Sequence, residues 1–480
     1  MEWSPPVFPD WIEGRAAINP NGVALTADGR AWTFAQLDTD VTRMARRLAG
    51  LGVETGDRVA TLLYNGSTAA ILPHALLRLG ATVVPLNTRL SQPEIEWQLS
   101  DASPRLVIVE KRTASLTTST TTTTVIDAAD LASAREAVVD LRLEHDADAI
   151  LAIIYTSGTT GRPKGAMLTV ANFWWSATGS ALNLSTRDDD RWIACLPLFH
   201  VGGLSIVMRS AIFGTTAVVQ DGFDAAAINE EIDKGATLVS VVSVMLDRMI
   251  DERNGRPYPA TLRCVLLGGG PAPAPLLDRC IALGIPVAQT YGLTETCSQA
   301  ATLAPEDARR KFGSAGKALH PNEIRVDDGE EILVRGPIVM AGYLNNPEAT
   351  ARALADGWLH TGDIGRIDSD GYLYVLDRRD DLIITGGENV YPAEVEAVLL
   401  AHDSVAEVGV IGVDDEKWGQ RVVAVVNLAV PIDAEELTEY CRLRLAGYKI
   451  PKEFRFTSDP LPRTASGKIR RVALRDIAAT

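Results

Sequence analysis

Hydroxyl groups, glycines and one lysine are concentrated in residues 155–169, where the sequence reads YTSGTTGRPKGAMLT. Glycines let backbone N–H groups come close to a phosphate, and serine and threonine hydroxyls add donors. Lys164 would neutralise part of the phosphate charge. No Gly-Lys-Ser/Thr sequence follows, so this is not the phosphate loop of the common NTPases. The alternative interpretation is a flexible Gly/Thr turn between a strand and a helix.

Two further loops rich in glycine or threonine each follow a buried strand, in residues 264–273 (CVLLGGGPAP) and 286–298 (PVAQTYGLTETCS). We expect the three loops to converge on one edge of a sheet, where α/β proteins bind ligands. A nucleotide suits that geometry, with a flat base against the backbone and Tyr291. Glu295 would hold Mg²⁺, which usually takes one or two carboxylates beside substrate phosphates. Alone, Glu295 is better explained as a solvated loop acid.

Three other side chains are candidates for ligand contact. His200 stands where the predicted strand RWIACLPLF ends in a glycine-rich loop, and a structural role and a ligand-facing role are both open. Asp363 lies between glycines, and we expect it to be exposed and able to bond a ribose diol. Lys468 lies in LPRTASGKIRR, which is either a basic loop or a source of a cation delivered to a site elsewhere.

Strand–helix alternation in the first 300 residues predicts parallel sheets covered by helices, and hence an α/β fold. The predicted helices span 34–51, 67–80, 91–100 and 170–184, and the predicted strands include 58–64, 81–87, 105–110 and 149–155. From Gly313 the pattern EIRVDDGEEILVRG indicates an antiparallel hairpin and a β-rich subdomain over about 313–376. The charged run DRRDD marks a boundary. We therefore expect a large N-terminal domain, 1–376, and a small α+β domain, 377–480.

Composition excludes several classes of protein. The chain has 480 residues, 46% hydrophobic and 22% charged, as in ordinary globular proteins, and this length favours more than one core. Its formal net charge of −16 disfavours nucleic acid or an anionic membrane as partner. Five scattered cysteines disfavour a disulfide framework and a zinc site. No signal peptide and no membrane-spanning run is apparent, so we expect a cytoplasmic protein. The tract LTTSTTTTT, 116–124, has low complexity and is expected to be a surface loop.

Five motifs, taken together and in order, resemble those of the acyl-adenylate-forming superfamily, which includes acyl-CoA synthetases, luciferases and peptide-synthetase adenylation domains. They are YTSGTTGRPKG, YGLTET, TGD, DRRDDLIITGGENVYPAEVE and PRTASGK, and they span residues 155–468. Longer stretches, such as SALNLSTRDDDRWIACLPLFHVGGLS and QTYGLTETCSQ, are similar to the o-succinylbenzoate–CoA ligases of menaquinone biosynthesis. This similarity extends over nearly the whole chain, and it is weakest in the threonine tract.

The resemblance implies a two-step reaction that uses ATP, Mg²⁺ and coenzyme A. A carboxylate would attack the α-phosphorus of ATP, and the CoA thiol would then displace AMP from the acyl-adenylate. The small domain would be mobile, turning about Asp377 between the steps. Lys468 would bridge carboxylate and α-phosphate in the first step, and His200 would edge the acyl pocket. In a dicarboxylic substrate such as o-succinylbenzoate, the second carboxylate would need a cation, and Arg209, within an apolar segment, is a candidate for it or for an internal salt bridge.

The implied site residues fall into four groups. The phosphate and Mg²⁺ contacts are Thr156, Ser157, Gly158, Thr159, Thr160, Lys164 and Glu295, with Thr160 and Glu295 at the metal. The nucleoside contacts are Gly268, Gly269, Gly270, Gln289, Thr290, Tyr291, Gly292, Thr294, Asp363 and Arg378. The contacts made by the small domain are Gly386, Gly387, Lys449 and Lys468. The substrate contacts are His200 and Arg209. 

Alternatives share most of these motifs. A ligase for malonate, an aryl acid or a fatty acid would differ only in its acyl pocket. An adenylating enzyme that loads a carrier protein would form no CoA thioester. A regulatory nucleotide-binding protein is disfavoured because Lys468 and Glu295 are both present. Whether the chain forms a homo-oligomer is left open.

Overall fold

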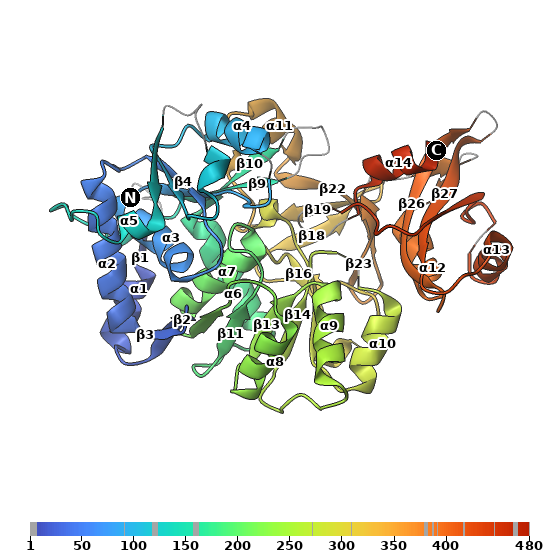
Figure 1. Ribbon diagram of the computed structural model, residues 1–480, viewed down its shortest axis with the longest axis horizontal. Coiled ribbons are helices and arrows are strands. Elements are labelled where there is room, and N and C mark those ends of the chain that lie inside the picture. Colours follow the sequence, from blue (N-terminus) through green and yellow to red (C-terminus); the bar gives the residue numbers. More distant parts are fainter. Residues whose placement is uncertain are drawn as a thin grey trace.

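The computed structural model describes residues 7–479 apart from a few positions (Figure 1). The positions outside the description within that range are 91, 118–122, 157–162, 271, 309, 379–382, 386–387, 391, 416–417, 446 and 464–468. Most of the tract 116–124, the core of the first loop and Lys468 therefore lie outside the described residues. The described chain forms two large sheets, two five-stranded sheets and one two-stranded sheet.

The first large sheet has seven strands in the order β20-β10-β9-β5-β4-β6-β7, of which β7, β6, β4, β5 and β9 run parallel. The strands are β4 (Arg58–Leu62), β5 (Thr82–Pro85), β6 (Leu106–Val109), β7 (Thr124–Asp127), β9 (Ile150–Thr156), β10 (Lys164–Thr169) and β20 (Gly342–Tyr343). Successive residues of β6 enter different cores, Leu106 and Ile108 on one face and Val107 and Val109 on the other. Both faces are covered, which explains the unbroken apolar runs.

The second large sheet has nine strands in the order β17-β16-β15-β14-β13-β11-β12-β2-β3. The strands are β2 (Val23–Ala27), β3 (Arg30–Thr33), β11 (Arg191–Ala194), β12 (Thr216–Val219), β13 (Leu238–Val241), β14 (Cys264–Leu267), β15 (Val287–Tyr291), β16 (Ala301–Thr302) and β17 (Lys317–Ala318). Its outer face packs on α8 (Ala225–Asp233), α9 (Ser243–Arg253) and α10 (Ala274–Ala282) in a core of its own. The predicted α/β class is confirmed.

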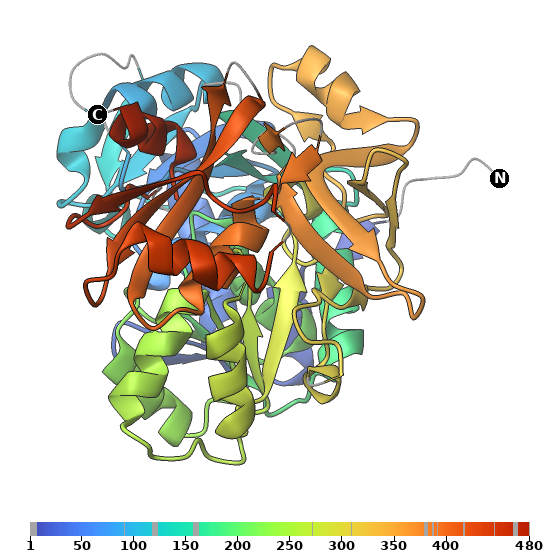
Figure 2. The ribbon, with the colours of Figure 1, turned by 90° about the vertical axis from the view of Figure 1, so that its right-hand side faces the viewer.

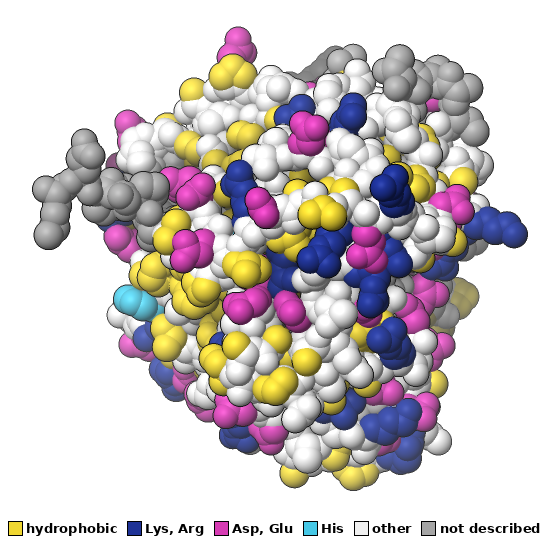
Figure 3. Space-filling model, turned by 90° about the vertical axis from the view of Figure 1, so that its left-hand side faces the viewer, with side chains coloured by type: hydrophobic (Ala, Val, Ile, Leu, Met, Phe, Trp, Pro, Cys, Tyr) yellow, Lys and Arg dark blue, Asp and Glu magenta, His cyan; other side chains and the backbone are white. Residues whose placement is uncertain are grey.

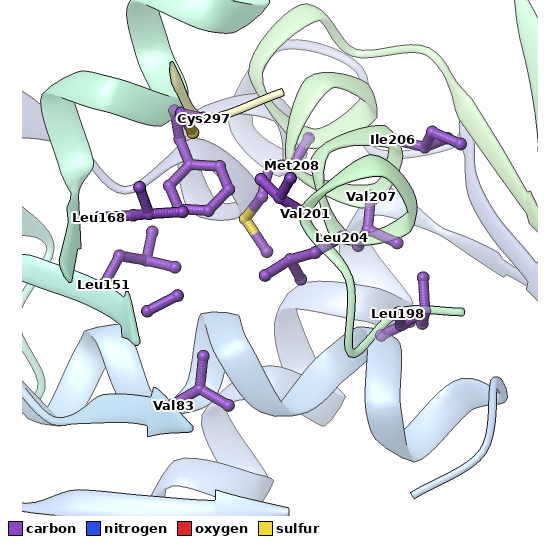
Figure 4. Packing of buried hydrophobic residues seen from close by; sticks show 14 of the residues in the cluster. Val83, Leu151, Leu168, Leu198, Val201, Leu204, Ile206, Val207, Met208 and Cys297 are labelled. Atoms are coloured by element: carbon purple, nitrogen blue, oxygen red, sulfur yellow. The ribbon is translucent and has the colours of Figure 1, made fainter. Parts of the chain in front are cut away.

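Two helices, α6 (Val170–Leu184) and α7 (Val201–Phe213), share one core with both large sheets. Figure 4 shows Leu204 and Met208 of α7 beside Leu151 and Leu168 of the first sheet. The same core includes Ala194 of β11 in the second sheet. The two sheets are therefore joined through α7, which carries His200 at its N-terminus and Arg209 in its third turn. The same part of the chain also contains a two-stranded pair, β1 (Val7–Pro9) and β8 (Glu144–Asp146). Its remaining helices are α1 (Trp11–Ile18), α2 (Phe34–Gly50), α3 (Ser67–Leu79), α4 (Gln92–Ala102) and α5 (Ala128–Leu131).

The predicted hairpin around residues 327–329 is confirmed, and it belongs to an antiparallel five-stranded sheet. The strands are β18 (Glu323–Val326), β19 (Glu331–Arg335), β21 (Leu354–Ala355), β22 (Trp358–Ile367) and β23 (Leu373–Arg378), beside α11 (Pro347–Ala353). A last sheet comprises β24 (Ile383–Thr385), β25 (Glu388–Val390), β26 (Val405–Asp415), β27 (Gly419–Leu428) and β28 (Glu453–Thr457), with α12 (Pro392–Leu400), α13 (Ala434–Arg442) and α14 (Arg471–Ala479). This last unit lies in front in Figure 2 and has its own cores, made only of residues from 383 onward. The predicted boundary at 376/377 stays a prediction.

Charge is mixed on the face shown in Figure 3, which contains α2: lysine and arginine side chains lie among acidic ones. Arg43 of α2, for example, lies 2.6 Å from the Asp40 carboxylate and 3.8 Å from Glu136. No helix among the described residues is long and apolar enough to cross a membrane.

A buried polar network holds the N-terminal helices together. Arg78 of α3 donates to both carboxylate oxygens of Asp10, at 3.0 and 2.7 Å, and to Asp38 of α2 at 2.6 Å. Asp10 also contacts the ring of His145, at 3.3 Å. His74 lies one helical turn from Arg78, and burial lowers its pKa to about 4, helped by the charge of Arg78 and opposed by that of Asp10.

We expect His74 to make the protein sensitive to acid. Because the unfolded chain binds a proton at a pKa of about 6.5 and the folded one only at about 4, stability falls as the pH drops through this window. At pH 5 the loss from this residue is about 2 kcal/mol of unfolding free energy. Urea titrations at pH 7 and pH 5, on the parent and on His74→Gln, measure it. The prediction is wrong if the variant loses stability as steeply as the parent.

Candidate active site

The first predicted loop joins two antiparallel strands, not a strand and a helix. Thr156 of β9 is opposite Lys164 of β10 in the ladder, so Lys164 and the residues after it form a strand. The Thr156 hydroxyl donates to the Lys164 carbonyl oxygen at 3.4 Å. Residues 157–162, which include the predicted contacts Ser157, Gly158, Thr159 and Thr160, lie outside the described residues. The ladder nevertheless brings Thr156 and Lys164 to the same end of the hairpin.

Glu295 lies in a short 3₁₀ turn (Thr294–Thr296) directly after β15. Its carboxylate oxygen Oε1 accepts a hydrogen bond from the hydroxyl of Tyr343 at 2.8 Å. The ammonium group of Lys164 lies 5.2 Å from the centre of the same tyrosine ring. Tyr343 thus brings together the predicted phosphate lysine and the predicted metal carboxylate, which are 131 residues apart in the sequence.

The contacts of Tyr343 show that one prediction is wrong. The three loops do not share the edge of one sheet, because β9 belongs to the seven-stranded sheet and β14 and β15 to the nine-stranded one. The site forms between the two sheets, at the end of the β9–β10 hairpin and beside the 3₁₀ turn.

The prediction that Asp363 is an exposed loop acid is also wrong. The residue lies in β22 and is only 4% exposed. The Tyr291 hydroxyl donates to its oxygen Oδ2 at 2.7 Å, which joins the end of β15 to the antiparallel five-stranded sheet. Asp363 is opposite Arg378 in the β22–β23 ladder, and Ile364 is opposite Asp377. The predicted ribose pair and the predicted hinge are therefore adjacent along two strands.

Close packing explains two of the predicted glycines. A Cβ on Gly292 would collide with the carbonyl oxygen of Ser298, and one on Gly268 would lie 2.9 Å from Cγ2 of Thr290. The Thr290 hydroxyl is used within the fold, donating to the Ala301 carbonyl oxygen at 2.9 Å. Leu267, just before the glycines, pairs with Gln289 in the β14–β15 ladder. The loop 268–270 and residues 289–294 are thus neighbours. Of the other two glycines in this loop, Gly269 has a φ of +81°, and Gly270 has open space at its Cβ position.

The prediction that His200 lies in a glycine-rich loop is wrong as well. It is the N-cap of α7, and the glycines after it are helical, so no glycine-rich loop follows β11. Gly203 is required because a Cβ there would collide with the carbonyl oxygen of Pro197. The Nε2 atom of His200 is buried and has no hydrogen-bond partner among the described residues. Burial, together with the charge of Arg89, lowers its pKa to about 4, so the ring is neutral at physiological pH.

The turn before His200 is fixed by Asn65, which follows β4 in the other sheet. Its side-chain amide donates to the Leu196 carbonyl oxygen at 2.9 Å and its side-chain oxygen accepts from the Leu198 N–H at 2.8 Å. This pair of bonds crosses between the two large sheets and sets the position from which α7 starts.

Arg209 is 3% exposed and has no carboxylate within ion-pair distance among the residues that the structure describes. One terminal nitrogen lies 3.2 Å from the Ser298 hydroxyl and 3.5 Å from that of Ser176, and the guanidinium faces the Trp192 ring at 5.3 Å. Its Nε has no hydrogen-bond partner within the described ranges. Burial lowers the pKa of Arg209 to about 10. A buried cation of this kind is costly unless an anion joins it.

The remaining predicted residues are not brought to this point by any described contact. Lys449 belongs to the small domain, where its ammonium lies 5.8 Å from the Tyr448 ring. Gly386, Gly387 and Lys468 lie outside the described residues, and nothing is described of the Arg378 and Asp377 side chains. No cluster of three or more histidine, cysteine or acidic side chains that would hold a metal occurs in the described part of the chain.

Three residues that contribute to the candidate site were not identified from the sequence: Asn65, Ser298 and Tyr343. Asn65 and Tyr343 act on partners 131 and 48 residues away, at Leu196 and Glu295. No local pattern marks such contacts. Ser298 had a local signal in the sequence, because it lies two residues after the YGLTET motif, and it stands close to Gly292 in a tight turn.

Comparisons with known proteins agree with this geometry. Residues 12–344 match the family model of AMP-binding enzymes, and residues 394–468 match the model of the AMP-binding enzyme C-terminal domain. A 2–succinylbenzoate–CoA ligase of Geobacillus sp. (strain WCH70) is 49% identical over 98% of this chain and 97% of its own length.

Solved structures of o-succinylbenzoate CoA synthetase from Bacillus subtilis are similar as well. The complex with the acyl-adenylate intermediate OSB-AMP has a TM-score of 0.93 at 43% identity, covering 98% of this chain and 99% of that one. The complex with ATP and a magnesium ion has a TM-score of 0.91 at 43% identity, covering 98% and 100%. The predicted family resemblance and the arrangement of a large N-terminal and a small C-terminal domain are confirmed.

Proposed function

The chain belongs to the AMP-binding enzyme family, and on this basis we propose that it is an AMP-forming acid–CoA ligase acting on 2-succinylbenzoate. The observation that carries the choice of substrate is the buried guanidinium of Arg209, which has no carboxylate partner in the described part of the chain. 2-Succinylbenzoate has two carboxylates, one to be activated and one that needs a cation. The name of the relative at 49% identity supports the same substrate.

The residues around Tyr343 fit ATP and Mg²⁺. Glu295 is half-buried, and Tyr343 occupies Oε1, while Oε2 has no hydrogen-bond partner among the described residues. One carboxylate beside substrate phosphates is a usual Mg²⁺ site. Bound there, Mg²⁺ would neutralise phosphate charge during the displacement at phosphorus. Lys164, at the end of the hairpin, would hold the β- and γ-phosphates with Thr156 and Ser157–Thr160.

The first half-reaction joins two anions, so positioning and charge neutralisation supply most of the catalysis. A carboxylate oxygen of the acid bonds to the α-phosphorus of ATP, and the bond from that phosphorus to the bridging oxygen breaks, releasing pyrophosphate. Glu295 and Lys164 hold the leaving group. Asp363 and Arg378 would hold the ribose, and residues 268–270 and 289–292 the base. Lys468 would bring a cation to the attacking carboxylate.

In the second half-reaction the sulfur of CoA bonds to the acyl carbon, the bond from that carbon to the AMP oxygen breaks, and the thiol proton is released. We propose that the small domain turns about Asp377 before this step, taking Lys468 away. Gly386 and Gly387 would then approach, since glycines leave room for the pantetheine arm, and Lys449 would face CoA. The domain limits 1–376 and 377–480 follow from this hinge.

The acyl pocket would lie between the start of α7 and the turn after β15. Arg209 would pair with the second carboxylate. His200 is neutral, and its Nε2 has no partner among the residues described, so it would offer one hydrogen bond without adding charge. We further propose a cytoplasmic location, which the five free and buried cysteines support.

The test is an acid-dependent AMP-release assay with ATP, Mg²⁺ and CoA. We expect 2-succinylbenzoate to give AMP, pyrophosphate and a CoA thioester, and malonate, benzoate and a medium-chain fatty acid to give at least about a hundredfold less, because none of them places a second carboxylate at Arg209 on an aromatic frame. Higher activity with one of the other acids would overturn the assignment of 2-succinylbenzoate as the substrate. Pyrophosphate exchange without a CoA thioester would point to a carrier protein as acceptor.

A further inference from the structure

Tyr343 has no assigned task in the reaction, yet it touches two groups that the proposed function uses. Its hydroxyl donates to Oε1 of Glu295 at 2.8 Å. Its ring centre lies 5.2 Å from the ammonium of Lys164, within the range of a cation–π contact. Tyr343 is buried, with 8% of its surface exposed, whereas Glu295 and Lys164 are half-buried.

The backbone around Tyr343 is fixed on three sides. Residues 340–344 cross from the turn of Glu295 to the β10 strand: Met340 N–H donates to the Glu295 carbonyl oxygen at 2.9 Å, and Leu344 N–H donates to that of Gly165 at 2.8 Å. β20 extends the seven-stranded sheet beside β10, with Gly342 opposite Met167.

The third side is α11. The Tyr343 N–H donates to the Thr350 hydroxyl at 2.8 Å. A Cβ on Gly342, whose φ is +145°, would lie 2.7 Å from Cγ2 of Thr350. The tyrosine is therefore held by the fold and not by the two charged groups, so it can impose a position on them.

We propose that Tyr343 is a positioning residue that sets the distance and orientation between the metal carboxylate of Glu295 and the phosphate cation of Lys164. The hydroxyl bond restrains the Glu295 side chain to one orientation, with Oε1 satisfied and Oε2 directed to the metal. The ring restrains the Lys164 side chain, which has many rotamers of its own. This inference rests on the proposed function, in which these two residues hold Mg²⁺ and the leaving phosphates.

The consequence is specific to metal use. Groups that orient a metal ligand through a hydrogen bond change metal affinity about 10- to 100-fold when they are removed. Tyr343→Phe deletes only the hydroxyl, so we expect about a tenfold higher Mg²⁺ concentration for half-maximal activity, with the maximal rate recovered at saturating Mg²⁺. Tyr343→Leu also deletes the ring, so a higher KM for ATP is expected in addition.

The measurements are acid-dependent exchange between ATP and pyrophosphate by the full chain, with Mg²⁺ varied at fixed ATP, and the Mg²⁺ dependence of ATP binding in the absence of acid. The half-saturating Mg²⁺ concentration does not depend on how much of a sample is folded, so a partly unfolded variant still gives a valid result. Tyr372→Phe is the matched control: its hydroxyl also donates to a carboxylate, that of Asp307 at 2.6 Å, and no described contact joins Tyr372 to Glu295 or Lys164. We expect no change in Mg²⁺ dependence for it.

Glu295→Gln serves as the reference. If Glu295→Gln shifts the Mg²⁺ dependence and Tyr343→Phe does not, the role of Tyr343 is overturned and the proposed function stands. If neither variant shifts it, the metal role of Glu295 is wrong and the inference falls with it. If Tyr343→Phe and Tyr372→Phe shift it equally, the shift does not arise from the contact of Tyr343 with Glu295, which also overturns the inference.

Discussion

Replacing Lys468 by alanine is expected to slow acid adenylation about a thousandfold while leaving thioester formation from supplied acyl-adenylate within about twofold of the parent rate. The reason is that the two half-reactions differ in charge. A carboxylate approaching the α-phosphate is an anion approaching an anion, and a delivered cation stabilises that transition state. The thiol that attacks the acyl-adenylate meets no such barrier, and Lys468 is proposed to have turned away by then.

Two separate assays check this prediction: ATP–pyrophosphate exchange for the first step, and CoA thioester formation from synthetic acyl-adenylate for the second. Lys452→Ala is a suitable control, since Lys452 belongs to the same small domain, donates to the Gly447 carbonyl oxygen at 3.2 Å and is exposed. An equal loss in both half-reactions of Lys468→Ala would contradict the delivery of a cation to the first step alone.

Replacing Arg209 by methionine is expected to lower kcat/KM for 2-succinylbenzoate on the order of a hundredfold, the usual effect of removing one partner of a buried charge pair. Methionine keeps most of the length and removes the charge. Thermal stability of the substrate-free variant is expected to stay level or rise, because the guanidinium is buried without a carboxylate partner among the described residues. A loss of activity without a loss of stability is the signature of a substrate-binding cation.

The measurements are kcat/KM for 2-succinylbenzoate and for its analogues that lack one carboxylate, together with the midpoint of thermal unfolding. Arg253→Met is the matched control: Arg253 is 4% exposed but has a carboxylate partner, Asp233, at 3.0 Å. That variant is expected to lose stability and to keep its preference for the dicarboxylate. An Arg209→Met enzyme that still prefers the dicarboxylate as strongly as the parent would show that the second carboxylate binds elsewhere.

Several features of this protein follow from its sequence alone, because they depend on neighbours in the chain. The YGLTET motif and the hairpin at residues 327–329 are local patterns, and each appears where the pattern places it. The helix α6 (Val170–Leu184) has the predicted bounds, since Thr169 caps its first turn through its own side chain. The end of α3 is equally local: Gly80, at φ +69°, takes the left-handed conformation that stops the helix.

Other features were decided by contacts between distant segments. His200 starts a helix rather than a loop because Asn65, 135 residues earlier in the chain, fixes the preceding turn and Gly203 permits close packing on Pro197. Asp363 is buried because Tyr291, from another sheet, supplies a hydroxyl to its carboxylate.

The joining of Lys164 to Glu295 also required the fold, since Tyr343 reaches both only after β20 has paired with β10. The residue types that can bind phosphate, metal and carboxylate can thus be recognised in the sequence, because the ability to bind each group is a property of the individual side chain. Their distances, burial and orientation are set by long-range packing between two sheets, and no pattern of neighbouring residues encodes that packing.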